Sequence, residues 1–109
     1  MNYLNFIIMI TDVINKNGWY QTLNENGKKI QEKHESSMGE LQGFTDRFMI
    51  FHKNGWFTTY DESFRKIAEK HESSIGIFKN ATGTTMIFTK NGWATTYDFT
   101  FKKISERHI

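Results

Sequence analysis

Three tryptophans at a regular spacing are the residues of this chain best suited to recognition chemistry. Trp19, Trp56 and Trp93 each end a copy of the sequence Lys-Asn-Gly-Trp, and successive copies are 37 residues apart. The face of an indole ring can stack on a sugar ring or a methylated cation, and repeated sites would give multivalent binding. The competing interpretation is that these side chains pack in the core, because most tryptophans are largely buried.

Polar side chains that could hydrogen-bond a ligand follow two of these tryptophans. The sequence Thr-Thr-Tyr-Asp occupies residues 58–61 and 95–98, and its polar counterparts in the first copy are Thr22 and Asn24. Hydroxyls and a carboxylate at a strand end could bind a polar ligand, or they could satisfy turn backbone and cross-strand pairs. The candidate binding residues from this set are Thr58, Tyr60, Asp61, Thr95, Tyr97 and Asp98.

A Glu-x-His pattern also recurs, with glutamates at 32, 69 and 106 and histidines at 34, 71 and 108. The spacing of two places each carboxylate and imidazole on one face of a strand, and three such histidines around an axis could ligate a metal. The surrounding segment is heavily charged, however, which favours solvated ion pairs of little energetic weight. We therefore predict no metal and no cofactor.

The sequence contains no recognisable catalytic motif. A catalytic acid and base need different pKa values, whereas near-copies of one unit give near-copies of each environment. We therefore predict that the chain is not an enzyme.

The 37-residue period defines the domain organisation. It divides the chain into units 1–37, 38–74 and 75–109, which together form a single repeat domain, 1–109. A fixed period of this length marks an array of similar supersecondary units, and 109 residues suffice for one modest core.

Composition narrows the functional classes. The aromatic content of 16% and charged content of 24% favour a folded, β-rich chain, and a net charge of +2 argues against nucleic acid. The absence of cysteine fits a reducing compartment. The apolar stretch 6–10 is too short to span a bilayer and lacks the flanks of a signal peptide, so we expect a cytoplasmic protein without a membrane partner.

Local signals predict strands joined by tight turns. The Asn-Gly pair of each Lys-Asn-Gly-Trp sequence predicts a type I′ hairpin, because Asn-Gly best tolerates positive φ at both central positions. In unit two the expected strands are 48–51, 56–61 and 64–71, and a short strand at 75–78 opens the next unit. The pattern predicts four antiparallel strands per unit and twelve in the chain.

The faces of these strands indicate how the units pack. Residues 48–51 are apolar on both faces, so this strand must be covered on both sides. The segment 64–71 is mostly charged, as in an outer edge strand that avoids pairing with other chains.

Residues 49–69, echoed at 86–106, resemble the second to fourth strands of blades in short-repeat β-propellers. The resemblance is generic and implies an all-β fold of three blades per chain, with no family site carried over. Since closed propellers have four or more blades, it implies a homodimer with a six-bladed ring. A β-trefoil or β-prism monomer, closed by three units of one chain, is the alternative.

Two functions fit these observations. The first is a non-catalytic interaction module whose symmetric β ring presents polar loops to a protein or peptide. The second is a lectin-like protein that binds glycans through repeated Trp-lined sites.

Overall fold

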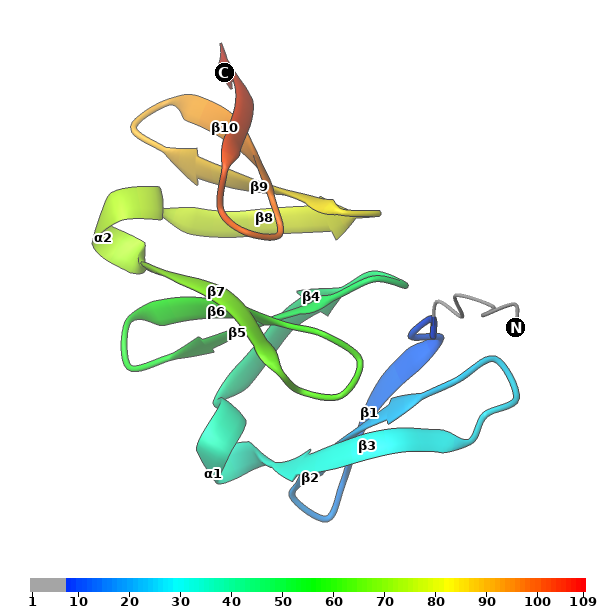
Figure 1. Ribbon diagram of the computed structural model, residues 1–109. Helices are drawn as coiled ribbons and strands as arrows, with labels where there is room; N and C mark the ends of the chain where they lie inside the picture. Colours follow the sequence, from blue (N-terminus) through cyan, green and yellow to red (C-terminus); the bar gives the residue numbers. More distant parts are fainter. Residues whose placement is uncertain (1–7) are drawn as a thin grey trace.

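A computed structural model describes residues 8–109 and consists of three antiparallel sheets and two one-turn helices (Figure 1). The first sheet contains β1 (Asp12–Lys16), β2 (Trp19–Leu23) and β3 (Lys29–His34). The second contains β4 (Glu40–Phe44), β5 (Met49–Lys53), β6 (Trp56–Tyr60) and β7 (Lys66–His71). The third contains β8 (Ile77–Thr82), β9 (Thr85–Lys90), β10 (Trp93–Asp98) and β11 (Lys103–His108). The helices α1 (Glu35–Met38) and α2 (Glu72–Ile75) connect the sheets.

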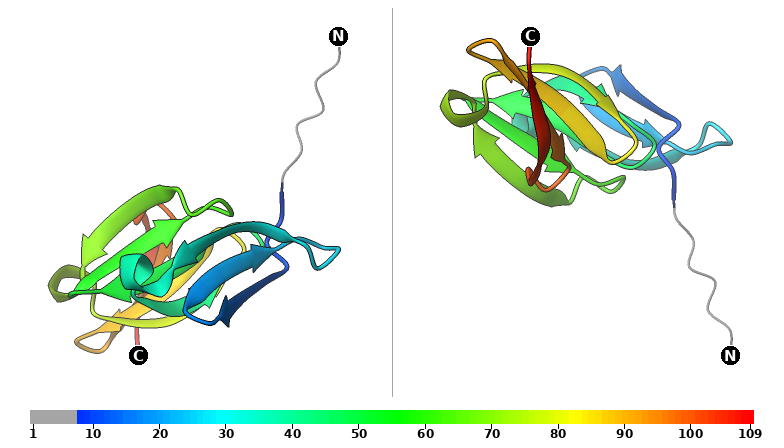
Figure 2. Two further views of the ribbon diagram at one scale, coloured as in Figure 1. Left: turned by 90° about the horizontal axis from the view of Figure 1, so that it is seen from below. Right: turned by 90° about the horizontal axis from the view of Figure 1, so that it is seen from above.

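The sheets follow the sequence repeat. Strands that are consecutive in the chain are neighbours in each sheet, and the second sheet lies between the first and the third (Figures 1 and 2). Residues 8–109 form no closed barrel. The predicted all-β class with repeated sheet units is therefore confirmed. The predicted strand that would open unit one falls outside the described residues.

The Asn-Gly turns that precede the three tryptophans have the predicted backbone conformation. Asn54 and Gly55 have φ of 51° and 85°, and the pairs at 17–18 and 91–92 are similar. Both central residues are thus left-handed, as a type I′ hairpin requires.

The turn after the central hairpin corrects one predicted boundary. The strand expected from Phe64 begins at Lys66, because Phe64 belongs to the turn and has a φ of 61°. The Asp61 carboxylate accepts hydrogen bonds from the backbone N–H groups of Ser63 and Arg65, both at 2.9 Å. These bonds hold the turn while the Phe64 side chain is buried in the core.

The sequence did not predict the one-turn helices, which occupy the connections between units. The strand expected at 75–78 therefore begins later, at Ile77, because Ile75 ends α2. His71 caps α2, since its Nδ1 accepts a hydrogen bond from the Ser73 backbone N–H at 3.1 Å. His34 and Ser36 make the same bond at α1. Both helices lie along one side of the molecule, at the left of Figure 1.

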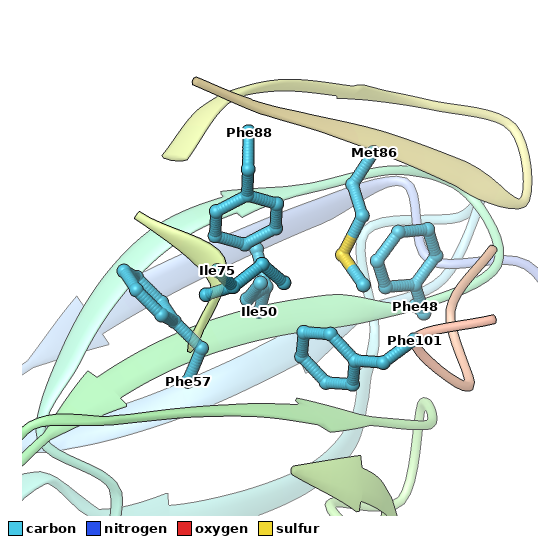
Figure 3. Close-up of a cluster of buried hydrophobic side chains, with 7 residues drawn as sticks. All are labelled: Phe48, Ile50, Phe57, Ile75, Met86, Phe88 and Phe101. Atoms are coloured by element: carbon cyan, nitrogen blue, oxygen red, sulfur yellow. The ribbon is translucent and has the colours of Figure 1, made fainter. Parts of the chain in front are cut away.

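The core is divided into two clusters, and each lies between consecutive sheets. The first cluster comprises Ile10, Val13, Met38, Met49, Phe51 and Phe64. The second comprises Phe48, Ile50, Phe57, Ile75, Met86, Phe88 and Phe101 (Figure 3). Alternation along β5 sends Met49 and Phe51 to one side and Ile50 to the other, so the prediction that this strand is covered on both faces is confirmed.

The last strand of each sheet is its charged edge, as predicted. Its lysine and glutamate form exposed ion pairs with Nζ to Oε1 distances of 2.8 Å in all three units: Lys29–Glu32, Lys66–Glu69 and Lys103–Glu106. In the first unit, the hydrogen bond from Lys29 lowers the pKa of Glu32. No helix within 8–109 is long and apolar enough to cross a membrane.

Candidate functional site

The three tryptophans are partly exposed, each at the start of a strand. Trp19, Trp56 and Trp93 begin the strands that follow the Asn-Gly turns, and their exposed fractions are 42%, 44% and 43%. The interpretation that they are core residues is therefore wrong. The strand after the turn sends Phe57 into the core and Trp56 to the opposite face.

Each indole ring meets a histidine ring from the neighbouring edge strand. The strand register places the two residues opposite each other, and each ring pair is close to perpendicular. The centroid distances are 5.0 Å for Trp19–His34, 5.0 Å for Trp56–His71 and 5.1 Å for Trp93–His108. A repeated aromatic pair thus marks the same corner of every unit.

The histidine of each Glu-x-His pattern has a structural use in the first two units. Nδ1 of His71 contacts both the backbone N–H and the hydroxyl of Ser73, at 3.1 and 2.8 Å. The backbone N–H of Glu72 donates to the Gly55 carbonyl oxygen at 2.8 Å, which joins the helix to the hairpin turn. Residues 8–109 contain no group of three or more His, Asp or Glu side chains arranged to hold a metal.

A recess beside Trp93 brings together three of the predicted binding residues. Its volume is about 250 Å³, and it lies between the connection after β7 and the third sheet. The residues that line it are Ser74, Ile75, Lys90, Asn91, Trp93, Thr95, Tyr97 and Glu106. Trp93, Thr95 and Tyr97 share this recess because alternate residues of β10 point to the same face.

In two units a lysine near the tryptophan hydrogen-bonds to the preceding connection. Lys90 donates from Nζ to the Ser73 carbonyl oxygen at 2.5 Å, and Lys53 makes the equivalent bond to Ser36 at 2.7 Å. In both units the lysine therefore ties the tryptophan hairpin to the preceding connection. The edge around Trp56 repeats the framework of the Trp93 recess.

The predicted residues of unit two lie on the corresponding face. Thr58 and Tyr60 share it with Trp56 and are half-buried. Tyr60 packs edge-on against Phe51, with ring centroids 5.6 Å apart, and burial raises the pKa of its phenol.

The two aspartates of the predicted set do not line the recess. Asp98 Oδ1 accepts hydrogen bonds from the Thr100 hydroxyl at 2.6 Å and from the backbone N–H groups of Thr100 and Lys102 at 2.8 and 3.0 Å. The bond from the Thr100 hydroxyl is the main cause of a lowered pKa for Asp98. Asp61 occupies the same place in the preceding unit. Both carboxylates are engaged in forming turns.

A second cavity, which the sequence did not predict, lies between the second and third sheets. It has a volume of about 390 Å³ and is lined by Gln42, His52, Phe57, Glu72, Ser73, Gly76, Ile77 and Phe78. Nε2 of His52 lies 2.7 Å from Oε1 of Glu72. Repetition could not have revealed this cavity, because units one and three have Asn15 and Thr89 at the position of His52. The only sign of this cavity in the sequence was that His52 departs from the repeat.

Comparison with known proteins supplies no further assignment. No protein-family model matches this chain, and no curated protein matches it.

Proposed function

We propose that this chain is a non-catalytic binding module that recognises a glycan through the surface around its exposed tryptophans. The observation that carries the proposal is the Trp93 recess, where a partly exposed indole lies beside hydroxyl, amide and carboxylate groups. Sugar rings pair an apolar C–H face with a rim of hydroxyls, and this combination of side chains complements both. Repetition of the Trp–His corner supports multivalent recognition of a repeating ligand.

Tryptophan fluorescence with a panel of oligosaccharides tests this proposal. We expect a saturable change in emission that Trp93→Ala strongly reduces, because the stacking surface is lost. Phe51→Leu is an aromatic control, since Phe51 is buried in the first core cluster and lines neither recess. If no carbohydrate in the panel changes the emission or binds in calorimetry, the glycan proposal fails.

A peptide or protein ligand is the second candidate, and the larger cavity favours it. Phe57 and Phe78 supply an apolar lining, while the His52–Glu72 pair supplies polar groups at the edge. Such a site suits one apolar side chain flanked by backbone hydrogen-bonding groups. A peptide-array signal that His52→Ala removes and Trp93→Ala leaves intact would support this candidate over the glycan.

We also infer that the three sheets are successive blades of a propeller-like ring. The two core clusters, both between consecutive sheets, support this arrangement, as does the contact between the opening strands β4 and β8. Side-chain hydrogen bonds between sheets within 8–109 also join consecutive units, including Tyr20 to Gly39 and Thr45 to Gly83. A β-trefoil or β-prism would instead bring the first unit against the third.

A further inference from the structure

A buried threonine makes the same hydrogen bond at both junctions between sheets. The Thr22 hydroxyl donates to the Glu62 carbonyl oxygen at 2.7 Å, and the Thr59 hydroxyl donates to the Phe99 carbonyl oxygen at 2.6 Å. Both threonines are 0% exposed. Each bond crosses from one sheet to the second residue of the Asx turn in the next sheet. It therefore fixes how consecutive units dock.

The donor side of this bond is repeated in the third sheet. Thr96 occupies the position of Thr59, and the register pairs it with Ile87 as Thr59 is paired with Ile50. No sheet follows within residues 8–109, so Thr96 has no corresponding carbonyl there. The hydroxyl that docks the next unit thus lies on an open face.

The acceptor side is repeated in the first sheet. The turn at Asn24 has the same bonds as the turn at Asp61: its Oδ1 accepts from the backbone N–H groups of Asn26 and Lys28 at 2.9 and 3.0 Å. The Gly27 N–H donates to the Asn24 carbonyl oxygen at 2.9 Å, as the Phe64 N–H does to Asp61 at 3.0 Å. The second residue of this turn is Glu25, the equivalent of Glu62. Its carbonyl oxygen receives no threonine hydroxyl within the described residues.

The open face of the third sheet also keeps the apolar residues of the internal junctions. Ile87 stands at the position of Ile50, which is completely buried between sheets two and three. Ile104 stands at the position of Ile67, which packs against the second core cluster, yet Ile104 is 56% exposed. This face therefore has the pattern of an interface that the described chain does not cover.

The open face of the first sheet corresponds to the face of the second sheet that packs against the first. It is smaller and more polar than that face. Ile14 and Leu23 replace Phe51 and Tyr60, and both are half-buried. Asp12 replaces a buried methionine of unit two. A contact through this face would be weaker than the two internal ones, because less apolar surface is removed from water.

We propose that the third sheet of one chain docks head to tail on the first sheet of a second copy. Thr96 of each copy donates to the Glu25 carbonyl oxygen of the other, so two copies close a ring of six sheets. This inference rests on the proposed blade arrangement, and it extends an interface that the chain already contains twice. A head-to-tail contact forms a closed ring when its rotation returns to the first copy, and the proposed ring needs two such contacts.

The first test is the solution mass of the full chain, measured by light scattering over about a hundredfold range of concentration. We expect a species of twice 12.9 kDa that dissociates only on dilution. Thr96→Val removes the donor at both contacts of the ring, so we expect dimerisation to weaken by about tenfold or more. Ile87→Asp should give a monomer. Arg47→Asp also introduces a carboxylate, on an exposed turn of unit two and with a larger change of net charge, and should leave the dimer intact. Circular dichroism of each variant verifies folding.

Cross-linking tests the head-to-tail orientation directly, and the cysteine-free chain makes it specific. With a short bis-maleimide reagent, a mixture of Thr96→Cys and Glu25→Cys chains should give covalent dimers, whereas each variant alone should not. A monomer at every concentration, assemblies that grow beyond two chains, or equal cross-linking of the single variants would each overturn the proposal. Sugar binding is measured separately through Trp93, so loss of dimerisation with binding retained would leave the binding proposal intact.

Discussion

His71 lies edge-on to Trp56, with ring centroids 5.0 Å apart, while its Nδ1 accepts the hydrogen bond that begins α2. One side chain therefore supports both the exposed aromatic corner and the connection to the next sheet. This dual role links the stability of the fold to the shape of the candidate binding edge.

Replacing His71 with alanine should lower the free energy of unfolding by about 1 kcal/mol, because the helix loses its N-terminal cap. His71→Asn keeps a capping oxygen and should lose less stability while still removing the aromatic contact. Urea denaturation measures both effects. If the asparagine variant is as destabilised as the alanine variant, the cap is not the source of the stabilisation.

Replacing Thr59 with valine should destabilise the chain by about 1–3 kcal/mol, because the buried Phe99 carbonyl oxygen loses its donor. The neighbouring Thr58 is half-buried on the other face of β6. We expect Thr58→Val to have a smaller effect, within about 0.5 kcal/mol. Chemical denaturation of the two variants at one pH gives the comparison, and equal losses would argue against the cross-sheet bond.

Alanine should be tolerated less well at Gly76 than at Gly83. Both have positive φ, of 90° and 59°, but a Cβ at Gly76 would collide with the Thr89 carbonyl group, whereas a Cβ at Gly83 would meet nothing within 4 Å. Gly76→Ala should therefore cost more than about 2 kcal/mol and Gly83→Ala about 1 kcal/mol. Thermal melting of the pair measures the difference. Similar melting temperatures would contradict the close packing at the end of α2.

Stability should fall in acid partly through Asp98. Its pKa is lowered from 3.8 in the folded chain, mainly by the Thr100 hydroxyl, so the unfolded chain binds more protons near this pH. The resulting stabilisation is present above about pH 3.8 and is lost as the pH falls through the folded-state pKa. Asp98→Asn should show a shallower decline when urea unfolding is followed from neutral to acidic pH. A decline as steep as that of the unchanged chain would assign the acid sensitivity to other groups.

The features predicted correctly from sequence are those dictated by local chemistry. Asn-Gly encodes its hairpin because few other residue pairs adopt positive φ twice, and the double-faced apolar pattern of β5 specifies burial on both sides. The left-handed Phe64 was not predictable in the same way, because a bulky residue seldom adopts that conformation. Its conformation depends on the core that receives its side chain.

The candidate site was only partly predictable because it is assembled across units. The sequence identified Trp93, Thr95 and Tyr97, but the other wall of their recess comes from the connection after β7. Helices of four residues are too short to show a helical period, so their place beside the tryptophans could not be inferred. Trp93 shares its face of β10 with Tyr97, which packs against the second core cluster, and it is exposed at the start of the strand.

The two core clusters share the second sheet, and this gives the chain an order of unfolding. Loss of either outer sheet would expose one face of β5, with Met49 and Phe51 on one side or Ile50 on the other, so the central sheet depends on both neighbours. In such nearest-neighbour arrays the ends open first and the middle opens last. In the dissociated chain, amide protons of β5 and β6 should consequently exchange most slowly, and those of β1 and β11 should report the fraying of the array from its two ends.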